Sequence, residues 1–325
     1  MRTIRKEWQP SRSPDRLAKD FHGMIGTSPA MLRAFQLIRE VADSNTTILI
    51  TGPSGTEKEM AARAIHQRSS RASGPFVVIS CAAIRLEFLE SEFFGYENGG
   101  LSFLPPMPGK VELADLGTLF TEEVTELPLH FQGKLLRFLQ DYTFKRVGGS
   151  ETRKVDLRFI CSSNRDIKKL VEQGSFQQDL YLRLNGLTIE LPALKDRGVD
   201  AWLMAKAFLK SYAAKMGKGI LGFTQQAKKT ILAHSWPGNI PELESSICRS
   251  LVMAEGLWIT PQDLGLPTPE PLSLARPGFR ETITKYQVEL VARALADSGR
   301  NIGLSAKKLK ISRSVIYRLM KKYNL

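Results

Sequence analysis

Cysteine, acidic residues and long apolar runs are all scarce in this chain of 325 residues. Its three cysteines, Cys81, Cys161 and Cys248, are odd in number and widely spaced, which argues against a disulfide framework or a zinc site. No apolar run is long enough to cross a membrane, and the first residues are polar and basic, unlike a signal peptide. We therefore expect a cytoplasmic protein without membrane association, in which the cysteines are buried structural thiols.

The shortage of acidic residues leaves a net charge of +13, from 46 Lys and Arg against 33 Asp and Glu. Such an excess favours a polyanionic partner, although surface lysines can also serve solubility. The position of the charge decides between the two. Between residues 280 and 322 the only acidic residues are Glu281, Glu289 and Asp297, and the basic ones are Arg280, Lys285, Arg293, Arg300, Lys307, Lys308, Lys310, Arg313, Arg318, Lys321 and Lys322. This concentration predicts that the C-terminal region binds DNA.

A phosphate-binding loop follows a strand-like run at residues 47–50 and precedes a helix-like run at residues 60–65. The residues expected to bind nucleotide are Gly52, Pro53, Ser54, Gly55, Thr56, Glu57, Lys58 and Glu59. In such a loop backbone N–H groups surround the phosphates, and a glycine before the lysine lets the backbone approach them closely. Glu57 occupies that glycine position, so a carboxylate adds bulk and negative charge near the phosphates. The sequence therefore predicts a nucleotide-binding fold with impaired turnover.

Composition divides the chain into five segments. In chain order we expect a flexible basic arm (1–21), an α/β core (22–191), a helical lid (192–260), a Pro-rich linker (261–278) and a helix-turn-helix DNA-binding domain (279–325). The arm is too short for a receiver or other sensory domain. Within the core, helical stretches alternate with strand-like runs at 47–50, 76–79, 119–120, 157–161 and 187–191. This alternation predicts a parallel sheet covered on both faces.

Four further motifs follow the phosphate-binding loop. They are Ser91-Glu92-Phe93-Phe94-Gly95-Tyr96-Glu97, Gly117-Thr118-Leu119-Phe120, Asp179-Leu180-Tyr181-Leu182-Arg183-Leu184 and Trp236-Pro237-Gly238-Asn239-Ile240-Pro241-Glu242-Leu243. In this order they resemble the bacterial enhancer-binding proteins, the AAA+ activators of sigma-54 RNA polymerase. The resemblance starts near residue 23 and covers nearly all of the chain from there. It implies an AAA+ P-loop sheet with a helical lid, a C-terminal Fis-type helix-turn-helix, and ATP or ADP with Mg²⁺ as cofactors.

The resemblance also assigns the catalytic positions. Glu122 stands where the family has a Mg²⁺-binding aspartate, Glu123 where it has the catalytic glutamate, and Asn164 where it has a sensor asparagine. The extra methylene of Glu122 displaces its carboxylate by about one carbon–carbon bond, in a site that demands near-ideal octahedral geometry. We therefore expect weak Mg²⁺ binding by Glu122 and poor catalytic alignment.

Three altered positions weaken this site further. Ser80 stands where the family usually has an asparagine that restrains the catalytic glutamate, and Gln177 replaces the first of two arginine fingers. Pro241 replaces a second sensor arginine that contacts nucleotide, whereas Arg183, the second finger, is retained. Because one finger is worth orders of magnitude in rate, we expect little or no ATP hydrolysis.

The loop that contacts sigma-54 is altered as well. The family sequence GAFTGA aligns with Gly99-Gly100-Leu101-Ser102-Phe103-Leu104. Leu101 and Ser102 replace the Phe and Thr that contact sigma-54, and Phe103 replaces a flexible glycine. We therefore expect impaired contact with sigma-54. The alternative explanation is that an unused loop has simply drifted in sequence.

The last residues predict two helices joined by a short turn. Ala306 and Leu309 mark the buried side of the first helix, and Ser312 can cap the second, in which Ile316 packs inward. The residues expected to bind DNA are Arg313, Ser314, Tyr317, Arg318, Lys321 and Lys322. An ordinary basic surface helix is the alternative. Lys310 replaces the glycine usual in the family's turn, at a cost of about 1 kcal/mol if this residue is left-handed.

Together these features predict a DNA-binding transcriptional regulator on a degenerate AAA+ scaffold, a dimer or higher oligomer on DNA, with RNA polymerase as a further partner. Two alternatives stay open. One is a slow ATP-dependent sigma-54 activator, alone or completed by hetero-oligomers with an intact paralogue. The other is a sensor whose old nucleotide pocket accepts a signalling nucleotide.

Overall fold

The computed structural model describes residues 23–97, 105–266, 290–291, 294–295, 298 and 301–323. The chain divides into two compact units, Met1–Pro267 and Thr268–Leu325. Three predicted features lie outside the described residues, namely the arm at 1–21, the sigma-54 loop at 99–104 and the linker from residue 267 onward. Within the described part of the chain, no helix has both the length and the apolar character needed to cross a membrane.

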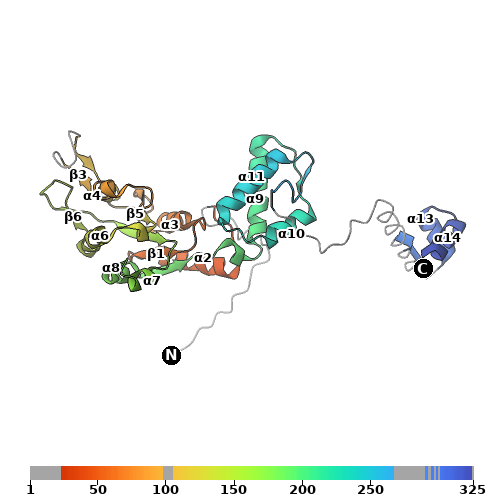
Figure 1. Cartoon of the computed structure of the whole chain (residues 1–325), viewed down its shortest axis with the longest axis horizontal. Helices are drawn as coiled ribbons and strands as arrows, with labels where there is room; N and C mark the ends of the chain where they lie inside the picture. The colour runs from red at the N-terminus through yellow and green to blue at the C-terminus, as the bar shows by residue number, and fades with distance from the viewer. Residues whose placement is uncertain are drawn as a thin grey trace, which may run out of the picture. The chain divides into compact units, whose positions relative to one another are not determined.

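The first unit begins with an α/β core (Figure 1). Its helices are α2 (Pro29–Val41), α3 (Lys58–Gln67), α4 (Leu89–Phe94), α5 (Lys110–Leu113), α6 (Leu129–Asp141), α7 (Ile167–Glu172) and α8 (Gln178–Leu184). Its strands are β1 (Ile48–Thr51), β2 (Phe76–Ser80), β3 (Gly95–Tyr96), β4 (Met107–Pro108), β5 (Thr118–Glu122), β6 (Thr143–Phe144), β7 (Arg153–Lys154), β8 (Arg158–Ser163) and β9 (Leu187–Glu190).

Five of these strands form one parallel sheet in the order β2-β5-β8-β1-β9. Each of the five strand-like runs expected from the sequence overlaps one of them. Consecutive side chains of a strand point to opposite faces, so a sheet covered on both sides has apolar residues throughout its strands. In β1, Ile48 and Ile50 pack with α2 and α3, whereas Leu49 packs with α4 and α6–α8. The predicted doubly covered α/β fold is confirmed.

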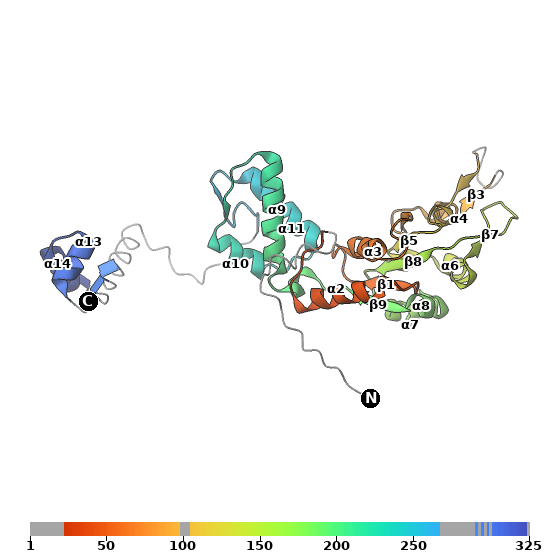
Figure 2. The ribbon, with the colours of Figure 1, turned by 180° about the vertical axis from the view of Figure 1, so that it is seen from behind.

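A helical lid completes the first unit. It consists of α9 (Asp200–Met216), β10 (Gly222–Phe223), α10 (Gln225–Ala233), α11 (Asn239–Met253) and β11 (Trp258–Ile259). Helices α9 and α11 lie side by side in both views (Figures 1 and 2). The chain breaks between the helices where the sequence predicted, at Gly217, which has φ of 63°, and around the buried Trp236. Asp200 ties α9 to the segment before α2, because its carboxylate accepts hydrogen bonds from the N–H groups of Thr27 (2.7 Å) and Ser28 (3.2 Å).

The second unit contains α13 (Ile302–Leu309) and α14 (Arg313–Tyr323). Asn301 caps α13 by accepting hydrogen bonds from the N–H groups of Gly303 and Leu304. Ala306 and Ile316 are buried between the two helices, as the apolar spacing predicted. Lys310 is left-handed, with φ of 51° and ψ of 42°. The turn therefore uses the backbone conformation that glycine adopts at least cost.

Candidate functional site

The phosphate-binding loop connects β1 to α3 and closely approaches two other segments. A Cβ atom built on Gly52 would lie 2.4 Å from the carbonyl oxygen of Leu191. One built on Gly55, which has φ of +75°, would lie 2.8 Å from Cδ of Pro241. Any side chain at either position would clash, so both glycines are required by the local packing as well as by the loop conformation.

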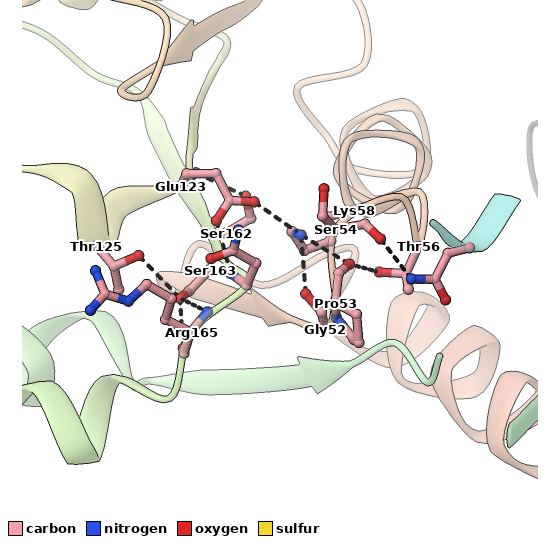
Figure 3. Close-up of polar contacts among 12 residues, drawn as sticks. Gly52, Pro53, Ser54, Thr56, Lys58, Glu123, Thr125, Ser162, Ser163 and Arg165 are labelled. Atoms are coloured by element: carbon pink, nitrogen blue, oxygen red, sulfur yellow. Dashed lines mark hydrogen bonds and ion pairs between the residues drawn. The ribbon is translucent and has the colours of Figure 1, made fainter. Parts of the chain in front are cut away.

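Lys58 and Glu123 form the polar centre of the site (Figure 3). The Lys58 ammonium lies 3.0 Å from Oε1 of Glu123, and the two side chains are only 5% and 14% exposed. The ammonium also donates to the carbonyl oxygens of Gly52 (3.1 Å) and Pro53 (3.3 Å). The other carboxylate oxygen of Glu123 accepts a hydrogen bond from the backbone N–H of Asn164 at 2.8 Å. The structure thus brings together three residues that lie far apart in the sequence.

Glu122 is the last residue of β5 and is paired in register with Ser80 at the end of β2. Next to this pair, burial and then the charges of Glu123, Glu122 and Glu126 raise the pKa of Cys81 to about 12. Cys81 is therefore a protonated thiol beside an acidic strand end, which suits the structural role expected of it. No cluster of three or more His, Cys, Asp or Glu side chains suited to a metal ion occurs among the described residues.

Glu57 is strained and electrostatically unfavourable. Its backbone is left-handed, with φ of 68° and ψ of 38°, and Oε2 of its carboxylate is buried without a hydrogen-bond partner. Burial raises the pKa of Glu57 to about 7, while the charge of Arg197 lowers it and that of Glu244 raises it. These two charged groups belong to the segment before α9 and to α11. Glu57 therefore couples electrostatically to the lid side of the site.

The lid is bound directly to the phosphate-binding loop. The side-chain amide of Asn239 donates to the carbonyl oxygen of Ser54 (2.8 Å), and the N–H of Ile240 donates to that of Gly55 (3.2 Å). Arg197 is fully buried and donates from Nη2 to the carbonyl oxygen of Thr56 at 3.2 Å. Sequence analysis assigned no role to Asn239 or Arg197. Asn239 lies in a recognised motif, but Arg197 carries no local signal of this contact.

Pro241, which we expected to correspond to a second sensor arginine, lies at the start of α11. Its ring packs on Gly55, and it supplies neither a positive charge nor a donor to the site. Arg197, in the segment before α9, donates to the carbonyl oxygens of Pro192 and Thr56. The lid therefore holds the loop through backbone and side-chain hydrogen bonds and through the apolar contact of Pro241 with Gly55.

Gln177 and Arg183, which we expected to correspond to arginine fingers, lie at the two ends of α8. Gln177 precedes the helix, and Arg183 is in its last turn. The Gln177 amide donates to the carbonyl oxygen of Leu129 at the start of α6 (3.0 Å). The exposed Arg183 donates through Nε (3.1 Å) and Nη2 (2.5 Å) to the carbonyl oxygen of Leu139 near the end of the same helix. Both side chains fasten α8 to α6, so they do not approach the phosphate-binding loop of their own chain.

The predicted DNA-binding residues lie in α14. Arg313, Ser314, Tyr317 and Arg318 are all exposed, and Ile316 between them is buried. The side chains of Lys321 and Lys322 lie outside the described residues. Sequence spacing therefore placed these four side chains on the solvent face of the helix correctly.

Comparison with known proteins identifies the same two parts, an AAA+ core and a lid. Residues 24–190 match the sigma-54 interaction domain, and residues 195–270 match an AAA+ ATPase lid domain. The chain is 39% identical over 296 residues to the transcriptional regulatory protein ZraR of Salmonella typhimurium, covering 90% of this chain and 67% of ZraR. It is 37% identical over 312 residues to the regulatory protein AtoC of Escherichia coli strain K12, covering 93% of this chain and 68% of AtoC.

Solved structures agree as well. The crystal structure of NtrX from Brucella abortus in complex with ATP is 35% identical, with a TM-score of 0.70, over 96% of this chain and 71% of NtrX. The complex of NtrX with ADP is 34% identical with a TM-score of 0.70, over 94% of this chain and 70% of NtrX. With its parallel P-loop sheet, its lid and these relatives, the chain belongs to the enhancer-binding protein family of transcriptional regulators, which carry a sigma-54 interaction domain and an AAA+ lid.

Proposed function

We propose that this protein is a DNA-binding transcriptional regulator in which the AAA+ site has lost most of its ATP hydrolysis and its contact with sigma-54. The observation that carries the proposal is the contact between the phosphate-binding loop and the lid, which involves Gly55 and Glu57 of the loop and Pro241 of α11. A buried, unpartnered carboxylate oxygen and a proline ring stand there, where the family has a glycine and an arginine.

The remaining loop fits a nucleotide. The two required glycines, the buried Lys58 and the backbone N–H groups at the start of α3 provide a phosphate cradle. NtrX, which has the same fold, was crystallised with ATP and with ADP. Binding would neutralise phosphate charge through Lys58, whereas Glu123 could orient a water only if its contact with Lys58 were loosened. These features favour nucleotide binding without efficient turnover, with Mg²⁺ held weakly by Glu122.

DNA binding would reside in the C-terminal unit. Arg313 begins α14, and the exposed face that continues through Ser314, Tyr317 and Arg318 offers donors for base edges and phosphates. Because this surface needs no nucleotide to form, we propose that the protein binds DNA independently of ATP. Regulation would then follow from position on the promoter, through contact with RNA polymerase or occlusion, in a dimer or higher oligomer.

One observation favours a second candidate, a sensor for a signalling nucleotide. A cavity of about 580 Å³ adjoins the phosphate-binding loop at Gly52 and Pro53, and its other lining residues include Asn164, Arg165 and Lys168. These cationic and amide groups, beside Asp166 and Glu190 of the same lining, would suit the phosphates and the polar groups of a signalling nucleotide. A thermal shift caused by such a nucleotide, with none caused by ATP, would favour the sensor.

The test of the main proposal is ATP turnover by the purified protein. We expect at least a roughly hundredfold lower rate than that of an intact family member, because loss of one arginine finger can cost that much. Glu57→Gly should restore tighter nucleotide binding while turnover stays low, unless Gln177→Arg and Pro241→Arg are added. Ordinary turnover by the unmodified protein would refute the proposal.

A further inference from the structure

The lid contains an apolar groove far from the phosphate-binding loop in sequence. Its volume is about 430 Å³, and its lining residues are Trp202, Lys206, Leu209, Lys210, Ala213, Ile220, Leu221, Gly222, Phe223 and Trp258. Beside it, Leu221, Leu257 and Trp258 are 65%, 57% and 51% exposed. The pairing of β10 with β11 holds these residues together, since the N–H of Leu221 donates to the carbonyl oxygen of Leu257 at 2.8 Å. Contiguous exposed apolar surface of this kind is typical of interaction sites.

The charged residues that line this groove, Lys206 and Lys210, are both basic. Residues 200–233, which form α9, α10 and the segment between them, contain one acidic residue, Asp200, and its carboxylate is buried against Thr27 and Ser28. The same stretch contributes Lys206 and Lys210 to the groove and Lys228 beside it. Glu255 precedes β11 and is not among the lining residues. The groove therefore offers an apolar floor with a cationic rim, which complements an occupant carrying apolar side chains and carboxylates.

The packing around Trp202 favours a peptide over a nucleic acid. The ammonium groups of Lys206 and Lys228 lie 5.7 and 5.4 Å from the ring centroid of Trp202, and Phe223 packs edge-on against it at 5.3 Å. Nucleic-acid bases need an open aromatic face for stacking, and Trp202 offers little of one. Trp258 is half exposed, with Gly222 against part of its ring, so stacking of a base on Trp258 is the outcome that the oligo-dT competition below tests.

We propose that this groove docks an acidic amphipathic helix of a partner protein. A helix places apolar residues on one stripe and carboxylates beside it, and so meets the floor and the rim together. A second copy of this chain as the occupant is the outcome that the sedimentation measurement below distinguishes. The docking site adds a protein input to the regulator, and it does not depend on nucleotide turnover or on DNA binding.

The test uses the full chain and a designed, fluorescein-labelled 18-residue helix, with Leu and Phe on one face and Glu elsewhere, in a fluorescence polarisation titration. We expect saturable binding to one site. The double variant Lys206→Glu/Lys210→Glu should weaken it by at least about tenfold, and so should Trp258→Ala. The matched control, Lys195→Glu/Lys229→Glu, makes the same change in net charge at exposed lid-unit lysines outside the groove lining, and should stay within about twofold of the wild type.

Four outcomes would overturn the proposal. The first two are the absence of saturable binding and an equal loss of affinity in the two double variants. The third is equal binding of a peptide whose Leu and Phe are replaced by Ser. The fourth is displacement of the peptide by oligo-dT, together with loss of oligo-dT binding in the Lys206→Glu/Lys210→Glu variant. A change of oligomeric state in that variant, measured by sedimentation, would instead make a second copy the occupant and would also refute the proposal. Circular dichroism of each variant separates loss of binding from loss of fold.

Discussion

At the scale of single residues, Glu57 combines an unfavourable backbone conformation with an unfavourable buried carboxylate. A glycine would adopt the same left-handed backbone at lower cost and would remove the buried carboxylate oxygen. The pKa of Glu57 rises from 4.5 to about 7 because burial disfavours the ionised form. Natural proteins retain such unfavourable features mainly where function requires them, so the effect of Glu57 on stability should be measured directly.

The pKa of Glu57 predicts a pH dependence of stability. Below pH 4.5 the side chain is protonated in both the folded and the unfolded chain, and it costs nothing. As the pH rises from 4.5 to about 7 the unfolded chain ionises first, so the folded state loses up to about 3 kcal/mol, and above pH 7 the loss is constant. We therefore expect the urea midpoint of Glu57→Gln to exceed that of the wild type at pH 8 and to approach it at pH 5.

Glu59→Gln is the control for this measurement, since its carboxylate is exposed and paired with Arg63 in the same helix. Its midpoint relative to the wild type should be similar at the two pH values. An equal gain for Glu57→Gln at pH 5 and pH 8 would contradict the assigned cause, and would point to backbone or packing effects instead.

Sequence alone identified the abnormal residues of the site but not their contacts. The presence of Glu57 in a glycine position and of Pro241 in an arginine position is visible in the motifs. The contact of Pro241 with Gly55, and the hydrogen bond from Asn239 to Ser54, join residues about 185 positions apart. Such contacts depend on how the lid docks on the core, which no local pattern encodes.

At the scale of helices and strands, predictability followed length and burial. The central strands β1, β5 and β8 were found because they are buried along nearly their whole length, which favours apolar residues on both faces. The edge strands β2 and β9 are half-buried or largely exposed, and their strand-like runs were found from shorter apolar segments. The pairs β3/β4, β6/β7 and β10/β11 were missed, since each strand has two residues and no periodicity to detect. The helix breaks at Gly217 and near Trp236 were found because glycine and proline mark them.

The turn between α13 and α14 gives a prediction at this scale. Lys310 adopts φ of 51°, so Lys310→Gly should stabilise the helix pair by about 1 kcal/mol in the folded state, partly offset by the greater freedom of glycine in the unfolded chain. Slower hydrogen exchange in residues 301–320 of the full chain would show the gain. Lys307→Gly, inside α13, should have the opposite effect, because glycine weakens a helix interior. Faster exchange in the Lys310→Gly variant would contradict this account of the turn.

The exposed face of α14 gives a second prediction. Arg313→Ala and Tyr317→Ala should each reduce the preference for an operator over random DNA by about 1–3 kcal/mol, since the start and outward face of such a helix approach base edges. Lys321→Ala should weaken binding to all sequences and flatten its salt dependence, if that side chain contacts only phosphate. Competition binding assays at two salt concentrations distinguish these patterns. Uniform losses for all three variants would indicate a basic surface without sequence readout.

At the scale of the whole molecule, the chain combines a lid-bound nucleotide site with a separate C-terminal unit. The family assignment was predictable because several motifs agree in order, and order is a property of the whole chain. The loss of turnover that we propose is not visible in the same way, because Lys58, Glu123 and Asn164 still meet at the site. It rests on the neighbouring positions Glu57, Gln177 and Pro241, which lack the glycine and the arginines expected there.

If ATP hydrolysis and contact with sigma-54 are lost as proposed, transcription controlled by this protein should not require sigma-54. Regulation by position needs affinity for the promoter and no chemical energy, so Lys58→Ala, if it folds normally, should retain control unless a bound ligand is the signal. Both Lys58→Ala and Lys58→Met remove the ammonium that lies 3.0 Å from Glu123. Lys58→Met keeps most of the apolar stem, so it is the matched second variant. Reporter output from a target promoter, in strains with and without sigma-54, measures both requirements. Control that disappears without sigma-54, and also with either Lys58 variant, would restore the ATP-driven activator and refute passive regulation.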